Sequence, residues 1–166
     1  LVTKFVAKHM LVRKKGSIIN IASDVGVISP DHRIYEANKK FNYKGVNFNT
    51  PISYAVAKSG IISMTRYLAT LWAKKGIRVN CISPAGVYKK HDKKFVEQLS
   101  QRIPLGRMAK RNEFNGAIIY LCSNASSFVT GHNLVVDGGR TIWWFFIFFF
   151  KYLNKLIQKK FFNFWY

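Results

Sequence analysis

Three side chains in this sequence have the types and the order that proton transfer requires: Ser23, Tyr54 and Lys58. Residues four apart share one face of a helix, so Lys58 can lie beside the ring of Tyr54. A free tyrosine is a poor acid or base at neutral pH, but a neighbouring cation favours its phenolate form. Ser23 directly follows an apolar run over residues 17–22. A phenol, an ammonium group and a hydroxyl brought together can act as one proton-transfer site.

The elements that must position these side chains are predicted from the apolar periodicity and the turn residues. The polar residues 24–50 predict a long loop, and long loops in compact domains are often functional. Helices that alternate with buried strands predict an α/β fold with parallel strands and right-handed crossovers. The predicted helices cover residues 1–12, 51–75, 93–101 and 113–122, the last capped by Asn112, and the predicted strands cover 17–22, 77–83 and 133–137.

The charge of the chain is strongly positive, with 27 Lys and Arg against 7 Asp and Glu and a net charge of +20. Such a field first raises the possibility of a nucleic-acid partner. The basic residues are scattered as doublets, such as Lys14-Lys15 and Lys74-Lys75, and no motif that reads DNA or RNA accompanies them. We therefore expect a solvated basic surface and no nucleic-acid partner.

The two cysteines, Cys81 and Cys122, fall in apolar segments without CxxC spacing. This placement predicts two reduced, buried thiols in a cytoplasmic protein, and neither a disulfide nor a metal site.

The two ends of the chain are unusual. The sequence begins at Leu1 with a helical pattern already under way, so we expect it to begin in the middle of a fold. Residues 142–150 form an apolar run that is shorter than the about 20 residues needed to span a bilayer, so no membrane span is predicted. The aromatic and lysine-rich residues 144–166 suit either an interfacial anchor or a non-native extension, and we expect the latter.

Five motifs in a fixed order resemble the short-chain dehydrogenase/reductase family over residues 1 to about 143. They are Asn20-Ile-Ala-Ser23, Tyr54-x-x-x-Lys58-Ser-Gly, Arg78-Val-Asn80-x-Ile-Ser-Pro84-x-Gly, Pro104-Leu-Gly-Arg-Met108 and Thr130-Gly-x-x-Leu-Val-Val-Asp137-Gly-Gly. The resemblance implies that residues 1–143 are the C-terminal part of a Rossmann-like, doubly wound parallel sheet with flanking helices. It also implies hydride transfer between NAD or NADP and a small alcohol or carbonyl compound.

The resemblance implies a role for each of the three side chains. Tyr54 would be the acid/base, Lys58 would favour its phenolate and hold the nicotinamide ribose, and Ser23 would bind the substrate oxygen. Tyr54 and Lys58 would thus serve catalysis and cofactor binding together.

The turn after the second predicted strand would pack against the nicotinamide. It comprises Pro84, Ala85, Gly86 and Val87. This turn departs from the family pattern, because Ala85 replaces the usual glycine and Lys89 the usual threonine. An alanine at this position requires a φ below zero.

The family's glycine-rich phosphate loop, Gly-x-x-x-Gly-x-Gly, is absent from the 166 residues. We therefore expect the catalytic and substrate half of an oxidoreductase, with the N-terminal strands missing. The resemblance also implies a homodimer or homotetramer. The segment from Ser29 to Glu36 is similar to family members of surface-sugar and flagellin-glycan biosynthesis and indicates a sugar-derived substrate. The alternatives are an inactive interaction or membrane-surface module and a basic nucleic-acid-binding protein.

Overall fold

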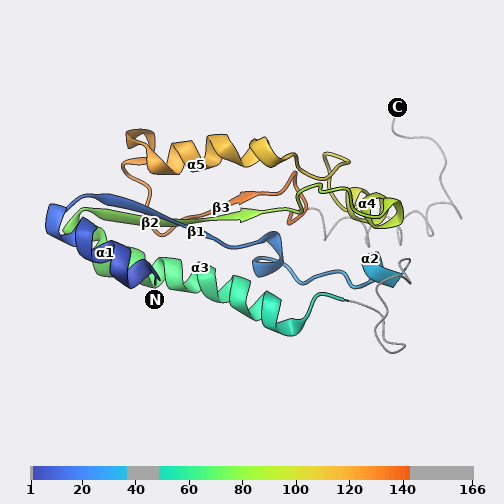
Figure 1. The fold of residues 1–166 in the computed structure, drawn as a ribbon, viewed down its shortest axis with the longest axis horizontal. Helices are drawn as coiled ribbons and strands as arrows, with labels where there is room; N and C mark the ends of the chain where they lie inside the picture. Colours follow the sequence, from blue (N-terminus) through green and yellow to red (C-terminus); the bar gives the residue numbers. More distant parts are fainter. Residues whose placement is uncertain (1, 37–48, 143–166) are drawn as a thin grey trace, which may run out of the picture.

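The computed structural model describes residues 2–36 and 49–142, which build an α/β fold on a parallel sheet (Figure 1). Its strands are β1 (Gly16–Ile21), β2 (Ile77–Pro84) and β3 (Asn133–Val136), in the order β1-β2-β3. Gly16 is in register with Ile77, and Cys81 with Asn133. All three carboxyl ends therefore lie at the same edge of the sheet.

Helices cover both faces of the sheet. The helices α1 (Val2–Arg13) and α3 (Ile52–Trp72) lie on one face, and α5 (Asn115–Cys122) lies on the other (Figure 1). Two short helices, α2 (Arg33–Glu36) and α4 (Lys93–Ser100), lie beyond the carboxyl ends of the strands (Figure 1). Short 3₁₀ turns complete the described part: η1 (Asp24–Gly26), η3 (Ala73–Lys75), η4 (Arg111–Phe114) and η5 (Asn124–Ser126).

The core is centred on β2, which is buried along nearly its whole length. Ile77 and Val79 pack against Ala7 of α1 and against Ala69 and Trp72 of α3. A short β-branched run of this kind suits a strand with helices on both faces.

The turn between α3 and β2 depends on Gly76, which has a φ of 74°. A Cβ there would lie only 2.1 Å from the Lys14 carbonyl oxygen, so the position requires glycine.

The predicted α/β class and parallel strands are confirmed, whereas the predicted helix cap at Asn112 is wrong. The prediction began the helix at residue 113 with Asn112 as its cap. The helix α5 begins instead at Asn115, and Asn112 lies within η4. The Glu113 carboxylate accepts a hydrogen bond from the Lys110 amide at 2.7 Å, which favours a tight 3₁₀ turn before the helix. The predicted loop 24–50 contains η1 and α2, and its residues 37–48 lie outside the described part.

The two cysteines differ in burial. Cys81 is buried in β2, where burial raises the pKa of its thiol. Cys122 is exposed, so the prediction of two buried thiols is wrong for it. On α5 the preceding residue, Leu121, is fully buried. Cys122 is the next residue around the helix and therefore points away from the buried face.

Within residues 2–36 and 49–142, no helix has the length and apolar character needed to cross a bilayer. Residues 144–166, for which we expect a non-native extension, lie outside the described part.

Candidate active site

Ser23 lies at the carboxyl end of β1, where the chain turns into η1. Its backbone is extended, and its side chain is buried. Ser23 Oγ accepts a hydrogen bond from the Val25 amide at 3.2 Å and donates one to Asp24 Oδ1 at 2.8 Å. The hydroxyl therefore caps η1, as serine often does at the start of a helical turn.

Tyr54 and Lys58 lie in the first two turns of α3. Tyr54 is 42% exposed, and Lys58 Nζ is 5.6 Å from the centroid of its ring. The same Nζ donates a hydrogen bond to the Ile21 carbonyl oxygen at 3.1 Å. Because Ile21 is the last residue of β1, this bond ties the Tyr54–Lys58 face of α3 to the strand end that leads to Ser23.

Gly26 brings the Ser23 loop directly onto α3. A Cβ at Gly26 would lie 2.8 Å from the carbonyl carbon and oxygen of Lys58, so the close approach requires glycine. Ser59 Oγ donates a hydrogen bond to the Gly26 carbonyl oxygen at 3.1 Å. The structure thus brings Ser23, Tyr54 and Lys58 to one end of the sheet.

The turn that follows β2 lies at the same edge of the sheet. The Ala85 amide donates to the Val136 carbonyl oxygen at 3.0 Å, and the Gly86 carbonyl oxygen accepts from the Ala109 amide at 3.1 Å. Val87 forms a parallel bridge with Ala109. Pro84, the last residue of β2, leads into this turn.

Ala85 has the φ below zero that an alanine requires in this turn. In the described part of the chain, the non-glycine residues with a positive φ are Lys14 and Lys90, so Ala85 has none. The alanine is therefore accommodated in this turn without backbone strain.

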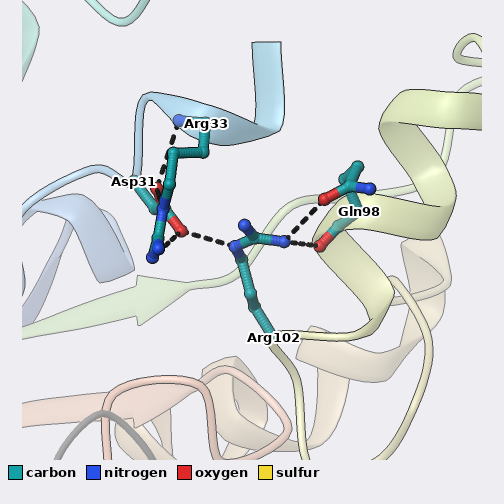
Figure 2. Close-up of polar contacts among 4 residues, drawn as sticks. All are labelled: Asp31, Arg33, Gln98 and Arg102. Atoms are coloured by element: carbon teal, nitrogen blue, oxygen red, sulfur yellow. Dashed lines mark hydrogen bonds and ion pairs between the residues drawn. The ribbon is translucent and has the colours of Figure 1, made fainter. Parts of the chain in front are cut away.

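A cluster of three charged residues and one glutamine joins the loop after η1 to α4 (Figure 2). The buried Asp31 accepts hydrogen bonds from Arg33 Nε at 2.7 Å and from Arg102 Nε at 2.5 Å. Arg102 Nη1 in turn donates to the Gln98 carbonyl oxygen at 2.6 Å. We call these residues, Asp31, Arg33, Gln98 and Arg102, the Asp31 clasp.

The clasp controls the ionisation of its carboxylate. Burial raises the pKa of Asp31, but the hydrogen bonds from Arg33 and Arg102 outweigh that effect and hold the pKa well below its ordinary value. Asp31 therefore remains ionised, and α2 stays tied to α4 beyond the strand ends.

Two residues of the sequence motifs serve the fold rather than this site. Arg78 donates to the carbonyl oxygens of Leu121 and Ser123 at the end of α5. Asn80, fully buried, donates to the Val129 carbonyl oxygen at 2.9 Å and accepts from the His132 amide at 3.0 Å. These bonds fix the chain that leads into β3.

The described residues contain no group of three or more His, Cys, Asp and Glu side chains that could hold a metal ion. The absence of a metal site was predicted from the cysteine spacing and stays a prediction for the chain as a whole.

Comparison with known proteins decides the family. A family model described as enoyl-(acyl carrier protein) reductase matches residues 41–141, which is more than half of the chain. The chain belongs to the short-chain dehydrogenase/reductase family. The three parallel strands correspond to the C-terminal half of the family's Rossmann fold.

Relatives in this family include several polyol dehydrogenases. An NAD-dependent glycerol dehydrogenase of Listeria innocua is 32% identical over 147 residues, which cover 86% of this chain and 51% of the relative. A D-arabinitol 2-dehydrogenase of Scheffersomyces stipitis is 44% identical over 98 residues, covering 54% of this chain and 35% of the relative. The chain thus spans about half the length, or less, of these curated relatives.

Solved structures agree on the fold. A short-chain dehydrogenase from Leptospira borgpetersenii with bound NAD+ is 38% identical with a TM-score of 0.75, covering 84% of this chain and 50% of that one. A gluconate 5-dehydrogenase from Burkholderia cenocepacia in complex with NADP and tartrate is 33% identical with a TM-score of 0.71, covering 85% and 51%.

Sequence reasoning missed two charged residues next to Ser23. Asp24 is 3% exposed and is paired with Arg140, which is 4% exposed and follows β3. The sequence signal for Asp24 was its position directly after Ser23. Arg140 had no such signal, because it is one of 27 basic residues in the chain.

Proposed function

We propose that the protein is an NAD(P)-dependent oxidoreductase that interconverts an alcohol and a carbonyl compound. One observation carries the proposal: the loop of Ser23 is seated on the turn of α3 that presents Lys58 beside Tyr54. A phenol, an ammonium group and a hydroxyl at the carboxyl edge of a parallel sheet occupy the place where α/β folds bind ligands.

The reaction places its electrostatic demand on the substrate oxygen. A bound nicotinamide supplies or accepts the hydride. As a carbonyl is reduced, its oxygen gains negative charge and needs a donor at the same moment. Tyr54 gives its hydroxyl proton to this oxygen, Lys58 stabilises the phenolate that remains, and Ser23 contacts the same oxygen. In the oxidation direction, the Tyr54 phenolate takes the hydroxyl proton of the alcohol.

The donor groups of this site suit part of the cofactor. Lys58 Nζ carries three donors, of which the Ile21 carbonyl oxygen occupies one, so the others are available for ribose hydroxyls. The turn of Pro84, Ala85, Gly86 and Val87 would hold the nicotinamide. The pyrophosphate would require a glycine-rich loop, which residues 1–166 do not contain.

The substrate we propose is a polyol or a sugar-derived alcohol. Relatives named for glycerol, D-arabinitol and D-threitol support this class. They do not support the narrower expectation of surface-sugar or flagellin-glycan biosynthesis. The Asp31 clasp fixes α2 against α4 beyond the carboxyl ends of the strands (Figure 2). We propose that these two helices form a fixed wall of the substrate-binding site.

We further propose a homo-oligomer built on α3. Its solvent side carries an apolar stripe of four side chains that are 48–81% exposed: Ile52, Val56, Tyr67 and Leu71. Their spacing places them within one face of the helix. An exposed apolar face of this kind favours packing against a second copy of α3.

Substitution of Tyr54 by Phe tests the function. The assay uses the full-length gene product that contains this sequence, here called the full-length protein. It measures the formation of NAD(P)H from NAD(P)+ with glycerol, D-arabinitol or D-threitol as substrate. Tyr54→Phe should lower kcat by roughly 10²–10⁴-fold, because the proton donor is lost. Tyr67→Phe is the matched control on the same helix, since Tyr67 is also exposed, and should keep wild-type kcat. Wild-type turnover by Tyr54→Phe would refute the assignment.

A further inference from the structure

A buried ion pair lies directly beside Ser23, and no step of the proposed mechanism uses it. Arg140 Nη1 donates to Asp24 Oδ2 at 2.5 Å, and both side chains are almost fully buried. Asp24 belongs to η1 after β1, whereas Arg140 follows β3. The pair therefore joins two segments that are 116 residues apart in the sequence.

The Asp24 carboxylate also holds the hydroxyl of Ser23. Its Oδ1 accepts hydrogen bonds from Ser23 Oγ at 2.8 Å and from the Val25 amide at 2.7 Å. An ionised carboxylate only accepts, so Ser23 must donate its proton to Asp24. The Val25 amide donates to Ser23 Oγ as well, at 3.2 Å. These two partners fix Ser23 Oγ in one place.

Arg140 is itself held by the turn after β3. The buried Asp137 accepts from the Gly139 amide at 2.8 Å and from the Thr141 amide at 2.6 Å. Arg140 Nε is buried without a hydrogen-bond partner among the described residues. A buried ion pair with an unsatisfied donor contributes little to stability, so stability alone does not account for this pair.

We propose that Asp24 and Arg140 are positioning residues that fix the Ser23 hydroxyl for the substrate oxygen. Asp24 holds Ser23 Oγ in place, and Arg140 both orients Asp24 and neutralises its charge. The single hydroxyl proton of Ser23 turns from Asp24 to the substrate oxygen when the substrate binds, while Oγ keeps its position. Without Arg140, a carboxylate so close to Ser23 would oppose the negative charge that develops on the substrate oxygen. This proposal rests on the proposed function, but its structural part can be tested without turnover.

The kinetic test removes the pair while it keeps the packing. Asp24→Leu combined with Arg140→Met replaces two buried charges by apolar side chains, a change that buried ion pairs often tolerate. In the full-length protein this double variant should lower kcat roughly tenfold to hundredfold, as expected when a catalytic group is displaced. In a Ser23→Ala background the same change should have no further effect. Glu113→Gln, which breaks the exposed pair with Arg107, is the control and should keep wild-type kcat.

A spectroscopic readout separates this proposal from the proposed function. Three-bond NMR couplings report χ1 of Ser23, which should occupy one rotamer in the wild type and several in the double variant. If Ser23 keeps a single rotamer there, or if kcat stays at the wild-type value, the positioning role is wrong. A wild type without turnover, together with loss of the single rotamer, would instead refute only the proposed function.

Arg140→Lys provides a second variant in case the double variant does not fold. It keeps the charge but loses the planar fork of donors. We expect a smaller loss of kcat that again disappears in the Ser23→Ala background. Equal losses with and without Ser23 would overturn the proposal.

Discussion

At the scale of single residues, Gly26 sets how closely the Ser23 loop approaches α3. A Cβ added at this position would meet the Lys58 backbone, which cannot rotate away as a side chain can. Interactions within the site therefore depend on a residue that has no chemistry of its own. The loop that carries Ser23 lies against the helix that carries Lys58 because glycine allows this close approach.

Gly26→Ala should destabilise the full-length protein and displace Ser23. The overpacked Cβ should cost about 1–3 kcal/mol of unfolding free energy, and kcat should fall with it. The control is Gly60→Ala in α3, where a Cβ meets nothing within 4 Å. That change should stabilise by roughly 0.5–1 kcal/mol, because alanine suits a helix interior better than glycine. Urea denaturation measures both values, and equal stability of the two variants would contradict this account.

The residues of the candidate site differ in how far the sequence could predict them. Tyr54 and Lys58 carry a local signal, since a spacing of four places them on one helical face. The partner of Asp24 carries none, because burial of Arg140 depends on tertiary packing between β1 and β3 segments. At Asn112 a local signal was misleading. Asparagine is a common helix cap, but Asn112 lies within η4, and the Glu113 carboxylate binds the Lys110 amide at the start of that turn.

At the scale of elements, the Asp31 clasp is a polar link between the segments of α2 and α4. The exposed Arg33 and the largely buried Arg102 bind the same carboxylate from opposite segments (Figure 2). The aromatic rings of Tyr35 in α2 and Phe95 in α4 also stack, with centroids 5.7 Å apart. The sequence predicted α4 as a helix over residues 93–101, whereas α2 falls within the predicted loop 24–50. The contact between α2 and α4 could not be predicted from periodicity.

The clasp should make stability fall at acid pH. The pKa of Asp31 is lower in the folded than in the unfolded state, where it is about 3.9. Its stabilising contribution is therefore fully present above about pH 5 and is lost as the pH falls below about 4. Asp31→Asn lacks this contribution, so the gap in unfolding free energy between wild type and variant should narrow from pH 5 to pH 2. Denaturation at stepped pH measures the gap.

Glu113→Gln is the comparison for that experiment. A hydrogen bond from Arg107 and another from the Lys110 amide lower the pKa of Glu113 to about 2. This exposed pair lies outside the clasp, so the variant should keep the acid dependence that Asp31 causes. A gap for Asp31→Asn that is constant from pH 5 to pH 2 would show that the clasp is not the source.

At the scale of the whole molecule, the described residues form the C-terminal half of a family fold. The alignment with the Leptospira borgpetersenii structure with bound NAD+ covers 84% of this chain but only 50% of that structure. It holds the side chains proposed for catalysis and lacks the glycine-rich motif for the pyrophosphate. The sequence therefore predicted the fold class, and the candidate site that its motifs indicate stays a prediction. The surfaces that bind a partner could not be predicted, because the sequence does not tell what covers the exposed helix faces.

The oligomer proposed on α3 should be sensitive to charge on its apolar stripe. Val56→Lys combined with Tyr67→Lys places two cations at its centre, where both side chains are more than half exposed. The full-length protein should then shift from dimer or tetramer to monomer in sedimentation analysis. Phe128→Lys, which also converts an exposed aromatic residue, is the control and should leave the oligomer intact. An unchanged oligomer in the α3 variant would place the interface elsewhere.

The transfer of deuterium tests the central claim most directly. The full-length protein is given NAD+ or NADP+ and a polyol deuterated at its carbinol carbons, and the reduced nicotinamide is examined by NMR. Our account predicts deuterium on the nicotinamide ring with the wild-type protein and almost none with Tyr54→Phe. Oxidation of the polyol without deuterium on the nicotinamide, or equal transfer by the Tyr54→Phe variant, would contradict it.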